Sequence, residues 1–79
     1  MVRCLFFAQC SDWMKVKELE IPLFSSISIQ QLLEKDLRFI QLNNRKSFLK
    51  VAINQVMVDF QTEVKNGDEI AFMPPFSGG

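Results

Sequence analysis

The sequence contains no histidine, and this absence excludes whole classes of chemistry. Histidine general bases, Ser-His-Asp and Cys-His nucleophile pairs, and metal sites built on imidazole all need that side chain. Net charge is also absent, because nine Lys and Arg residues are matched by nine Asp and Glu residues. Proteins that bind nucleic acids or anionic membranes usually carry a net positive field, so neither is expected as a partner.

Cysteine is scarce, with Cys4 and Cys10 as the only two. If the segment between them is extended, their Cα atoms lie about 20 Å apart, beyond the roughly 7 Å reach of a disulfide. We therefore expect reduced thiols and a cytoplasmic protein. Cys4 is interpreted as a small core side chain rather than a reactive group. Two cysteines are too few to hold an iron–sulfur cluster, and no metal site is predicted.

Long apolar runs are missing as well. No run approaches the ~18 residues that a membrane-spanning helix needs, so no span is expected. The apolar fraction of 48% over 79 residues is nevertheless typical of a globular chain with one core. We expect a single domain over residues 1–79.

The first half of the chain predicts a hairpin followed by a helix. Residues 2–9 are predicted to form a strand, residues 11–14 a turn, and residues 15–22 a second strand that ends at Pro22. Ser28 and Gln31 have the spacing of a helix capping box, and an apolar stripe follows at helical spacing. The predicted helix covers residues 29–38 with a Glu34–Arg38 pair, and residues 39–47 are predicted to be a loop.

The second half predicts three more strands. They are placed at residues 48–54, with Val51 and Ile53 facing inward, at 56–59 and at 69–73, with turns at Asn54-Gln55 and at residues 66–68. In the last strand Ile70 and Phe72 are expected to face the core. One helix and about five strands in this order indicate an α+β fold in which the helix covers one face of a mixed sheet.

The carboxyl-terminal residues 74–79 are the most informative stretch. Pro74 and Pro75 stiffen the exit from the last strand, and Gly78 and Gly79 have no Cβ, so such a tail can thread a narrow channel. A terminal carboxylate can also be activated as an acyl-adenylate and then attacked by a nucleophile. The alternative interpretation is two loose terminal residues without a function.

Several segments, taken in order, resemble one family. The sequence is similar to the small, sulfur-carrier subunits of molybdopterin synthase, which are ubiquitin-like β-grasp proteins. The segments that carry this resemblance are Leu5-Phe6-Phe7-Ala8-Gln9, Ala52-Ile53-Asn54-Gln55, Asn66-Gly67-Asp68-Glu69-Ile70-Ala71-Phe72 and Pro74-Pro75-Phe76-Ser77-Gly78-Gly79.

The resemblance implies a β-grasp fold and a mechanism. The Gly79 carboxylate, preceded by Gly78, would be adenylated by a ubiquitin-activating-type enzyme that uses ATP, and a sulfur donor would convert it to a thiocarboxylate. The tail would then enter the large synthase subunit and give its sulfur to the cyclic pterin precursor, within a heterotetramer. The chain would hold no stable cofactor and would not be catalytic alone.

Strand alternation adds a predicted docking surface. In the β-grasp order the first and last strands are neighbours, so Leu5 and Phe7 share the face away from the helix with Ala71 and Met73. Met57 extends this apolar patch, which Pro74, Pro75, Phe76 and Ser77 would continue toward the tail. Alternatively, a loop covers this face, or the register differs by one residue.

Other functions remain open on the sequence alone. The chain is also compatible with a sulfur carrier for thiamine synthesis or tRNA thiolation, with a ubiquitin-like modifier, and with a β-grasp interaction module whose tail is inert. Deletion of Gly79 separates the last of these from the carriers, and the identity of the binding partner separates the carriers from one another. The sequence leaves open whether Trp13 covers the core or makes an exposed contact.

Overall fold

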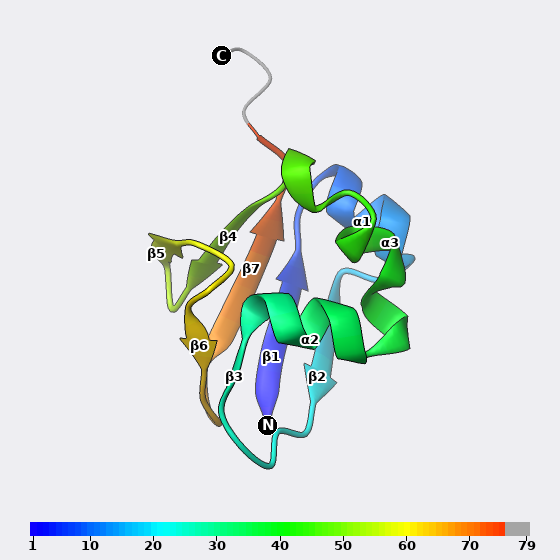
Figure 1. The fold of residues 1–79 in the computed structure, drawn as a ribbon. Coiled ribbons are helices and arrows are strands. Elements are labelled where there is room, and N and C mark those ends of the chain that lie inside the picture. Colours follow the sequence, from blue (N-terminus) through cyan, green and yellow to red (C-terminus); the bar gives the residue numbers. More distant parts are fainter. Residues whose placement is uncertain (76–79) are drawn as a thin grey trace.

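The computed structural model describes residues 1–75 as a five-stranded sheet and a two-stranded sheet with helices around them (Figure 1). The strand order of the large sheet is β2-β1-β7-β4-β5. Its central pair, β1 and β7, is parallel, and the other neighbouring pairs are antiparallel. The strands are β1 (Val2–Phe6), β2 (Glu18–Ile21), β4 (Lys50–Ile53), β5 (Val56–Val58) and β7 (Glu69–Met73).

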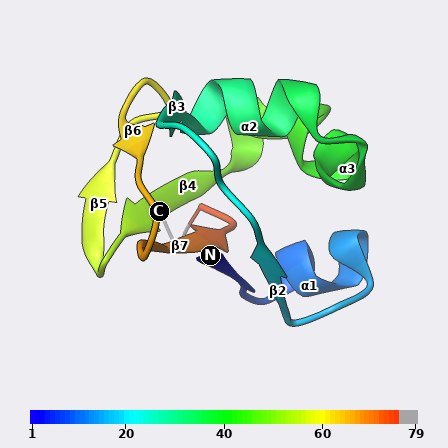
Figure 2. The ribbon, with the colours of Figure 1, turned by 90° about the horizontal axis from the view of Figure 1, so that it is seen from below.

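The core lies between this sheet and the helix α2 (Ile29–Lys35). Seen along the sheet, α2 covers one face, and no helix of the described chain lies on the opposite side (Figure 2). Phe6, Phe72 and Phe39 meet in this core with ring centroids 5.7 to 6.1 Å apart. Burial of such large rings is the main favourable contribution to folding in a chain of this size.

The end of β1 differs from the prediction. The strand ends at Phe6, and Ala8 adopts φ 50° and ψ −127°, in a turn closed by a hydrogen bond from Cys10 N to Phe7 O. A helix, α1 (Gln9–Met14), follows where a turn was predicted at 11–14. Cys10 is buried, and Trp13 and Met14 pack against the core, so tertiary packing favours the helix over the weak local signal.

The predicted hairpin is confirmed, although its strands are shorter. β1 and β2 pair in antiparallel register, with Val2 opposite Ile21. Cys10 lies in a helix rather than an extended segment, so the strand-based distance between the two cysteines does not apply. Both thiols are nevertheless free and buried, and Cys4 is the predicted core side chain.

Helix α2 begins as predicted, with both hydrogen bonds of the capping box between Ser28 and Gln31. It ends at Lys35 rather than Arg38, and Leu37 is 80% exposed instead of continuing the apolar stripe. The expected Glu34–Arg38 pair is wrong. Arg38 instead forms an ion pair of 2.7 Å with Asp36, and its hydrogen bond lowers the pKa of that carboxyl group.

The predicted loop at 39–47 is wrong as well. The chain forms the 3₁₀ turn η1 (Leu37–Phe39), the helix α3 (Ile40–Asn43) and the 3₁₀ turn η2 (Lys46–Phe48). Phe39 and Leu42 are fully buried and three residues apart. Residues at this spacing lie on the same face of a helical turn, so both can pack against the core. A small second sheet of β3 (Ile27–Ser28) and β6 (Glu63–Val64) was not predicted.

The carboxyl-terminal half follows the prediction closely, except that β4 begins at Lys50 and Phe48, predicted as the first residue of this strand, lies in η2. β4 and β5 form a hairpin through Asn54 and Gln55, both with positive φ, as a two-residue turn requires. Gly67 has φ +94° in the predicted turn before β7. Ile53 lies opposite Ile70 and packs against the core, as expected. No helix within residues 1–75 is long and apolar enough to cross a membrane.

Candidate functional site

The parallel pairing of β1 with β7 decides which side chains share a face. Phe6 lies opposite Phe72 and both point into the core, so Leu5 and its partner Ala71 face the other side. Phe7 continues the ladder through a hydrogen bond from its N–H to Phe72 O. The predicted register is therefore confirmed, and no element of the described chain covers this face.

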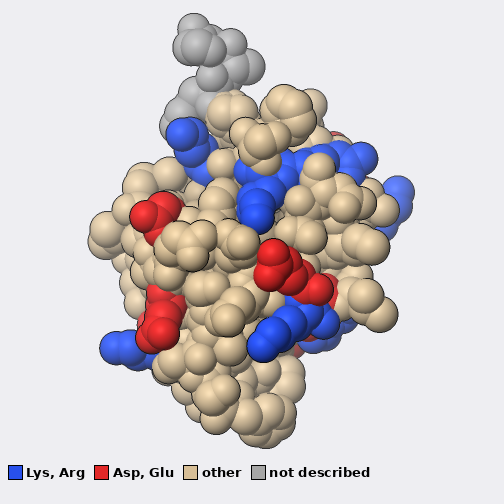
Figure 3. Space-filling view, viewed as in Figure 1, with Lys and Arg blue, Asp and Glu red and all other residues tan. Residues whose placement is uncertain are grey.

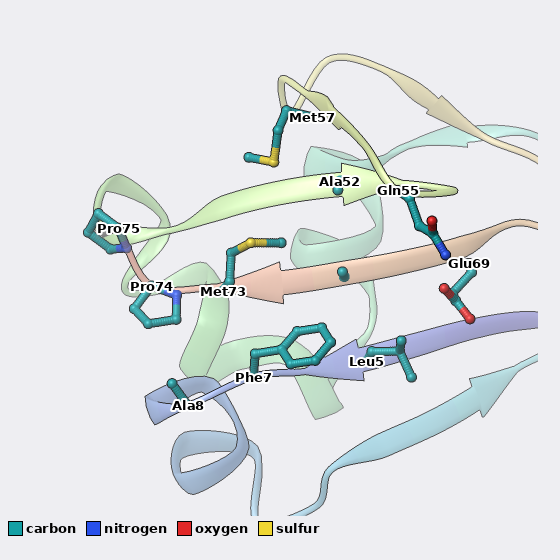
Figure 4. Close-up of a pocket in the computed structure, with 11 residues that line it drawn as sticks. Leu5, Phe7, Ala8, Ala52, Gln55, Met57, Glu69, Met73, Pro74 and Pro75 are labelled. Carbon is teal, nitrogen blue, oxygen red and sulfur yellow. The ribbon is translucent and has the colours of Figure 1, made fainter. Parts of the chain in front are cut away.

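These side chains line a concavity of about 670 Å³ on the helix-free side of the sheet (Figure 4). Phe7, directly after β1, is 49% exposed and Met57 of β5 is 55% exposed, which is unusual for large apolar side chains that line one concavity. Figure 4 shows Leu5, Phe7 and Met73 side by side across β1 and β7, with Met57 on the far side of β4. The structure thus brings together the predicted set Leu5, Phe7, Met57, Ala71, Met73, Pro74 and Pro75.

Four further residues line the concavity that the sequence reasoning did not name: Ala8, Ala52, Gln55 and Glu69. Ala52 lies between Met57 and Ala71 in the sheet register, so its methyl group and that of Ala71 leave room between the longer side chains. Side chains alternate along a strand, so the predicted inward direction of Val51 already implied that Ala52 faces outward. Gln55 and Glu69 form a polar boundary at the end away from the prolines.

The point where the chain leaves β7, here called the chain exit, lies at one end of this concavity. Met73 is the last residue of β7, and Pro74 and Pro75 contribute to the lining directly after it. A proline cannot donate to a sheet ladder, so the pair ends the strand at the edge of the apolar face. The predicted site residues Phe76, Ser77, Gly78 and Gly79 lie outside the described residues.

The two thiols are poorly placed for chemistry. Burial raises the pKa of Cys4 to about 12 and that of Cys10 to about 11, so both are protonated at neutral pH. No group of three potential metal ligands occurs within residues 1–75. Neither thiol lines the apolar concavity of the described chain.

A mixed sheet with a parallel central pair formed by its first and last strands, packed on one main helix, defines a β-grasp protein. Residues 4–79 match the model of the ThiS family, and the chain belongs to that family. It is 38% identical to the molybdopterin synthase sulfur carrier subunit of Haemophilus influenzae over the full length of both chains.

Solved structures agree on the fold. SAMP1 from Haloferax volcanii superimposes with a TM-score of 0.80 at 18% identity and covers 99% of this chain and 98% of its own. A protein–protein complex of subunits 1 and 2 of the molybdopterin-converting factor from Helicobacter pylori contains a chain that matches with a TM-score of 0.66 at 24% identity. This match covers 99% of the present chain and 97% of the other.

Proposed function

We propose that this protein is the sulfur carrier subunit of a molybdopterin synthase. The observation that carries the proposal is one apolar concavity that ends at Pro74 and Pro75, directly before the sequence Phe-Ser-Gly-Gly. A protein whose terminus must enter the active site of another protein needs a docking surface next to the residues where its tail begins. The full-length similarity to the Haemophilus influenzae carrier supports the same assignment.

The chemistry is assigned to the Gly79 carboxylate, which requires Gly79 to be the last residue of the mature chain. An adenylating enzyme of the ubiquitin-activating type joins this carboxylate to AMP from ATP and releases pyrophosphate. A sulfur donor then displaces AMP, and the product is a thiocarboxylate. In the large synthase subunit the thiocarboxylate sulfur is transferred to the cyclic pterin precursor, water restores the carboxylate, and two such transfers supply the two sulfur atoms of the dithiolene.

The chain's own residues hold and position rather than catalyse. Phe7, Met57 and Met73 offer exposed apolar area to a partner, while Gly78 and Gly79 lack side chains that would block a narrow channel. Acids, bases and phosphate-binding groups are therefore assigned to the partners. Buried, free thiols at Cys4 and Cys10 support a reducing compartment, and we place the protein in the cytoplasm.

The large subunit is the partner that distinguishes this function from its alternatives. The Helicobacter pylori complex pairs a chain of this fold with a second subunit, which supports a complex of the same kind here. A carrier for thiamine synthesis or tRNA thiolation would bind a different acceptor, and an inert interaction module would not need Gly79.

The test is a reconstituted reaction with the purified large subunit from the same organism and the cyclic pterin precursor. We expect the thiocarboxylated chain to bind this subunit and to yield molybdopterin. A chain that lacks Gly79 should bind and yield none. Binding to an acceptor of the thiamine pathway, with no binding to the large subunit, would assign the protein to the alternative class of carriers.

A further inference from the structure

A second concavity of about 440 Å³ lies beside the chain exit and shares Pro74 and Pro75 with the first. Its other walls come from Gln9 and Trp13 of α1 and from Arg45 and Phe48 around η2. Phe48 is 63% exposed although it lines the same concavity as Trp13, Pro74 and Pro75. The described chain therefore presents an apolar hollow on each side of the point where β7 ends.

Arg45 is held in place at the rim of this hollow. Its guanidinium carbon lies 4.9 Å from the centre of the Trp13 ring, within the range of a cation–π contact. Its Nη1 donates to the backbone oxygen of Gln41 at 3.0 Å and to the side-chain oxygen Oε1 of Gln41 at 2.7 Å. No carboxylate pairs with Arg45 among residues 1–75, so a planar donor group is fixed in position without an acidic partner there.

The charge around this hollow is one-sided. Residues 40–58 contain three basic residues, namely Arg45, Lys46 and Lys50, and no acidic residue, whereas Arg38 before them is paired with Asp36. Lys50 lies opposite Met73 in the sheet register, one residue before the prolines. Asp12 neighbours Trp13 in sequence but lines a different hollow together with Lys15 and Lys17.

The helix-covered side of the molecule carries basic side chains in its upper part, toward the end of β7 (Figure 1, Figure 3). Figure 3 shows one group of Lys and Arg side chains in the upper part of this side, and further Lys and Arg side chains lie lower, beside Asp and Glu side chains. Arg45 of the hollow and Lys50, opposite Met73, are therefore the positive charges that a partner would meet beside Pro74 and Pro75.

We propose that this hollow is a second docking surface for the large synthase subunit and that it takes an acidic segment of that partner. A partner carboxylate pairs with Arg45, and a neighbouring apolar side chain of the partner packs against Phe48 and Trp13. The inference rests on the proposed function, because a subunit that encloses the tail must contact both sides of the exit. It goes further by assigning acidic character to the partner surface on this side.

The experiment measures the dissociation constant for the purified large subunit by calorimetry. Arg45→Glu and Phe48→Ser are compared with Lys65→Glu, which makes the same change of charge, and with Phe24→Ser, which makes the same substitution. Both controls are at exposed positions outside both concavities. We expect each of the two hollow variants, Arg45→Glu and Phe48→Ser, to raise the dissociation constant about tenfold or more. Each control should change it less than about twofold. Arg45→Gln should also reduce the dependence of binding on salt.

Failure of this inference is distinguishable from failure of the proposed function. If Phe7→Asp abolishes binding but Arg45→Glu and Phe48→Ser bind like the original chain, the second surface is wrong and the first stands. If the original chain does not bind the large subunit, both proposals fall. A chain that stops at Pro75 tests whether the protein's own terminal residues occupy the hollow. If Arg45→Glu no longer weakens binding in this shortened chain, the hollow holds those residues and the inference is overturned.

Discussion

Phe6 and Phe72 stack across the parallel pair β1 and β7, with ring centroids 5.7 Å apart and planes inclined by 16°. One residue further along the chain in each case, Phe7 and Met73 point to the opposite face and line the apolar concavity. The same register therefore fixes the core and presents the apolar surface. A shift by one residue would exchange the two sets of side chains.

The first prediction concerns this stack. Phe72 is fully buried, so Phe72→Ala removes a ring from a packed core and should lower the free energy of unfolding by about 3–5 kcal/mol. Urea denaturation followed by circular dichroism measures the change. Phe24→Ala is the matched control, because Phe24 is 96% exposed and its loss should change stability by less than about 0.5 kcal/mol. Equal effects of the two substitutions would contradict the described core.

The second prediction separates binding from folding. Phe7→Asp places a charge in the apolar concavity and should weaken binding to the large subunit by about 100-fold, because the carboxylate would be buried without a partner. The unfolding midpoint should change little, since Phe7 is already 49% exposed. Phe24→Asp introduces the same charge far from the concavity and should bind normally. An unchanged affinity for Phe7→Asp would exclude this face as the docking surface.

The third prediction concerns the turn that leads into α1. Ala8 has φ 50° and ψ −127°, a combination that strains a residue with a Cβ. Ala8→Gly should therefore raise the free energy of unfolding by about 1 kcal/mol. Ser25→Gly, at an exposed bend without positive φ, should instead be neutral or slightly destabilising. If both glycines destabilise the protein alike, the turn geometry is wrong.

The fourth prediction follows from the buried thiols. Burial raises the pKa of Cys4 from the ordinary value of 9.0 to about 12 and that of Cys10 to about 11. At pH 8 neither thiol should react with iodoacetamide until the protein unfolds. Below about pH 9 both thiols are protonated in either state. Above it the unfolded chain ionises first, so stability should fall as the pH rises from about 9 toward 12.

This titration has a clean optical readout. The chain contains no tyrosine, so thiolate absorbance in the ultraviolet is free of tyrosinate. In denaturant both thiols should titrate near their ordinary pKa, which is the internal control. Titration of the native protein near pH 9 would show that the thiols are accessible and would contradict their burial.

Sequence reasoning predicted the parts of this fold that depend on alternation and on turn chemistry. The outward direction of Leu5, Ala71 and Met73 follows from a period of two, and Asn54-Gln55 is a turn whose partners are adjacent in the chain. Such signals are local, so one sequence suffices to detect them.

The parts that it missed depend on tertiary contacts. Helix α1 is short and the helical segment from Leu37 to Phe48 is divided into short pieces. Both are held by Cys10, Phe39 and Leu42 on the core rather than by helix propensity. The second hollow followed the same pattern, because Trp13 and Phe48 are brought together only by those missed elements. The apolar concavity is lined mainly by residues of the strands and was predicted, whereas the hollow beside it is lined mainly by residues of the helical segments and was not.

The most direct test of the central claim is the intact mass of the chain after incubation with the adenylating enzyme, ATP and a sulfur source. Replacement of one carboxylate oxygen of Gly79 by sulfur should add about 16 Da, and fragmentation should place the added mass on the terminal residue. The chain that lacks Gly79 should gain nothing under the same conditions. No mass gain on the complete chain, or a gain located at Cys4 or Cys10 instead, would contradict the account.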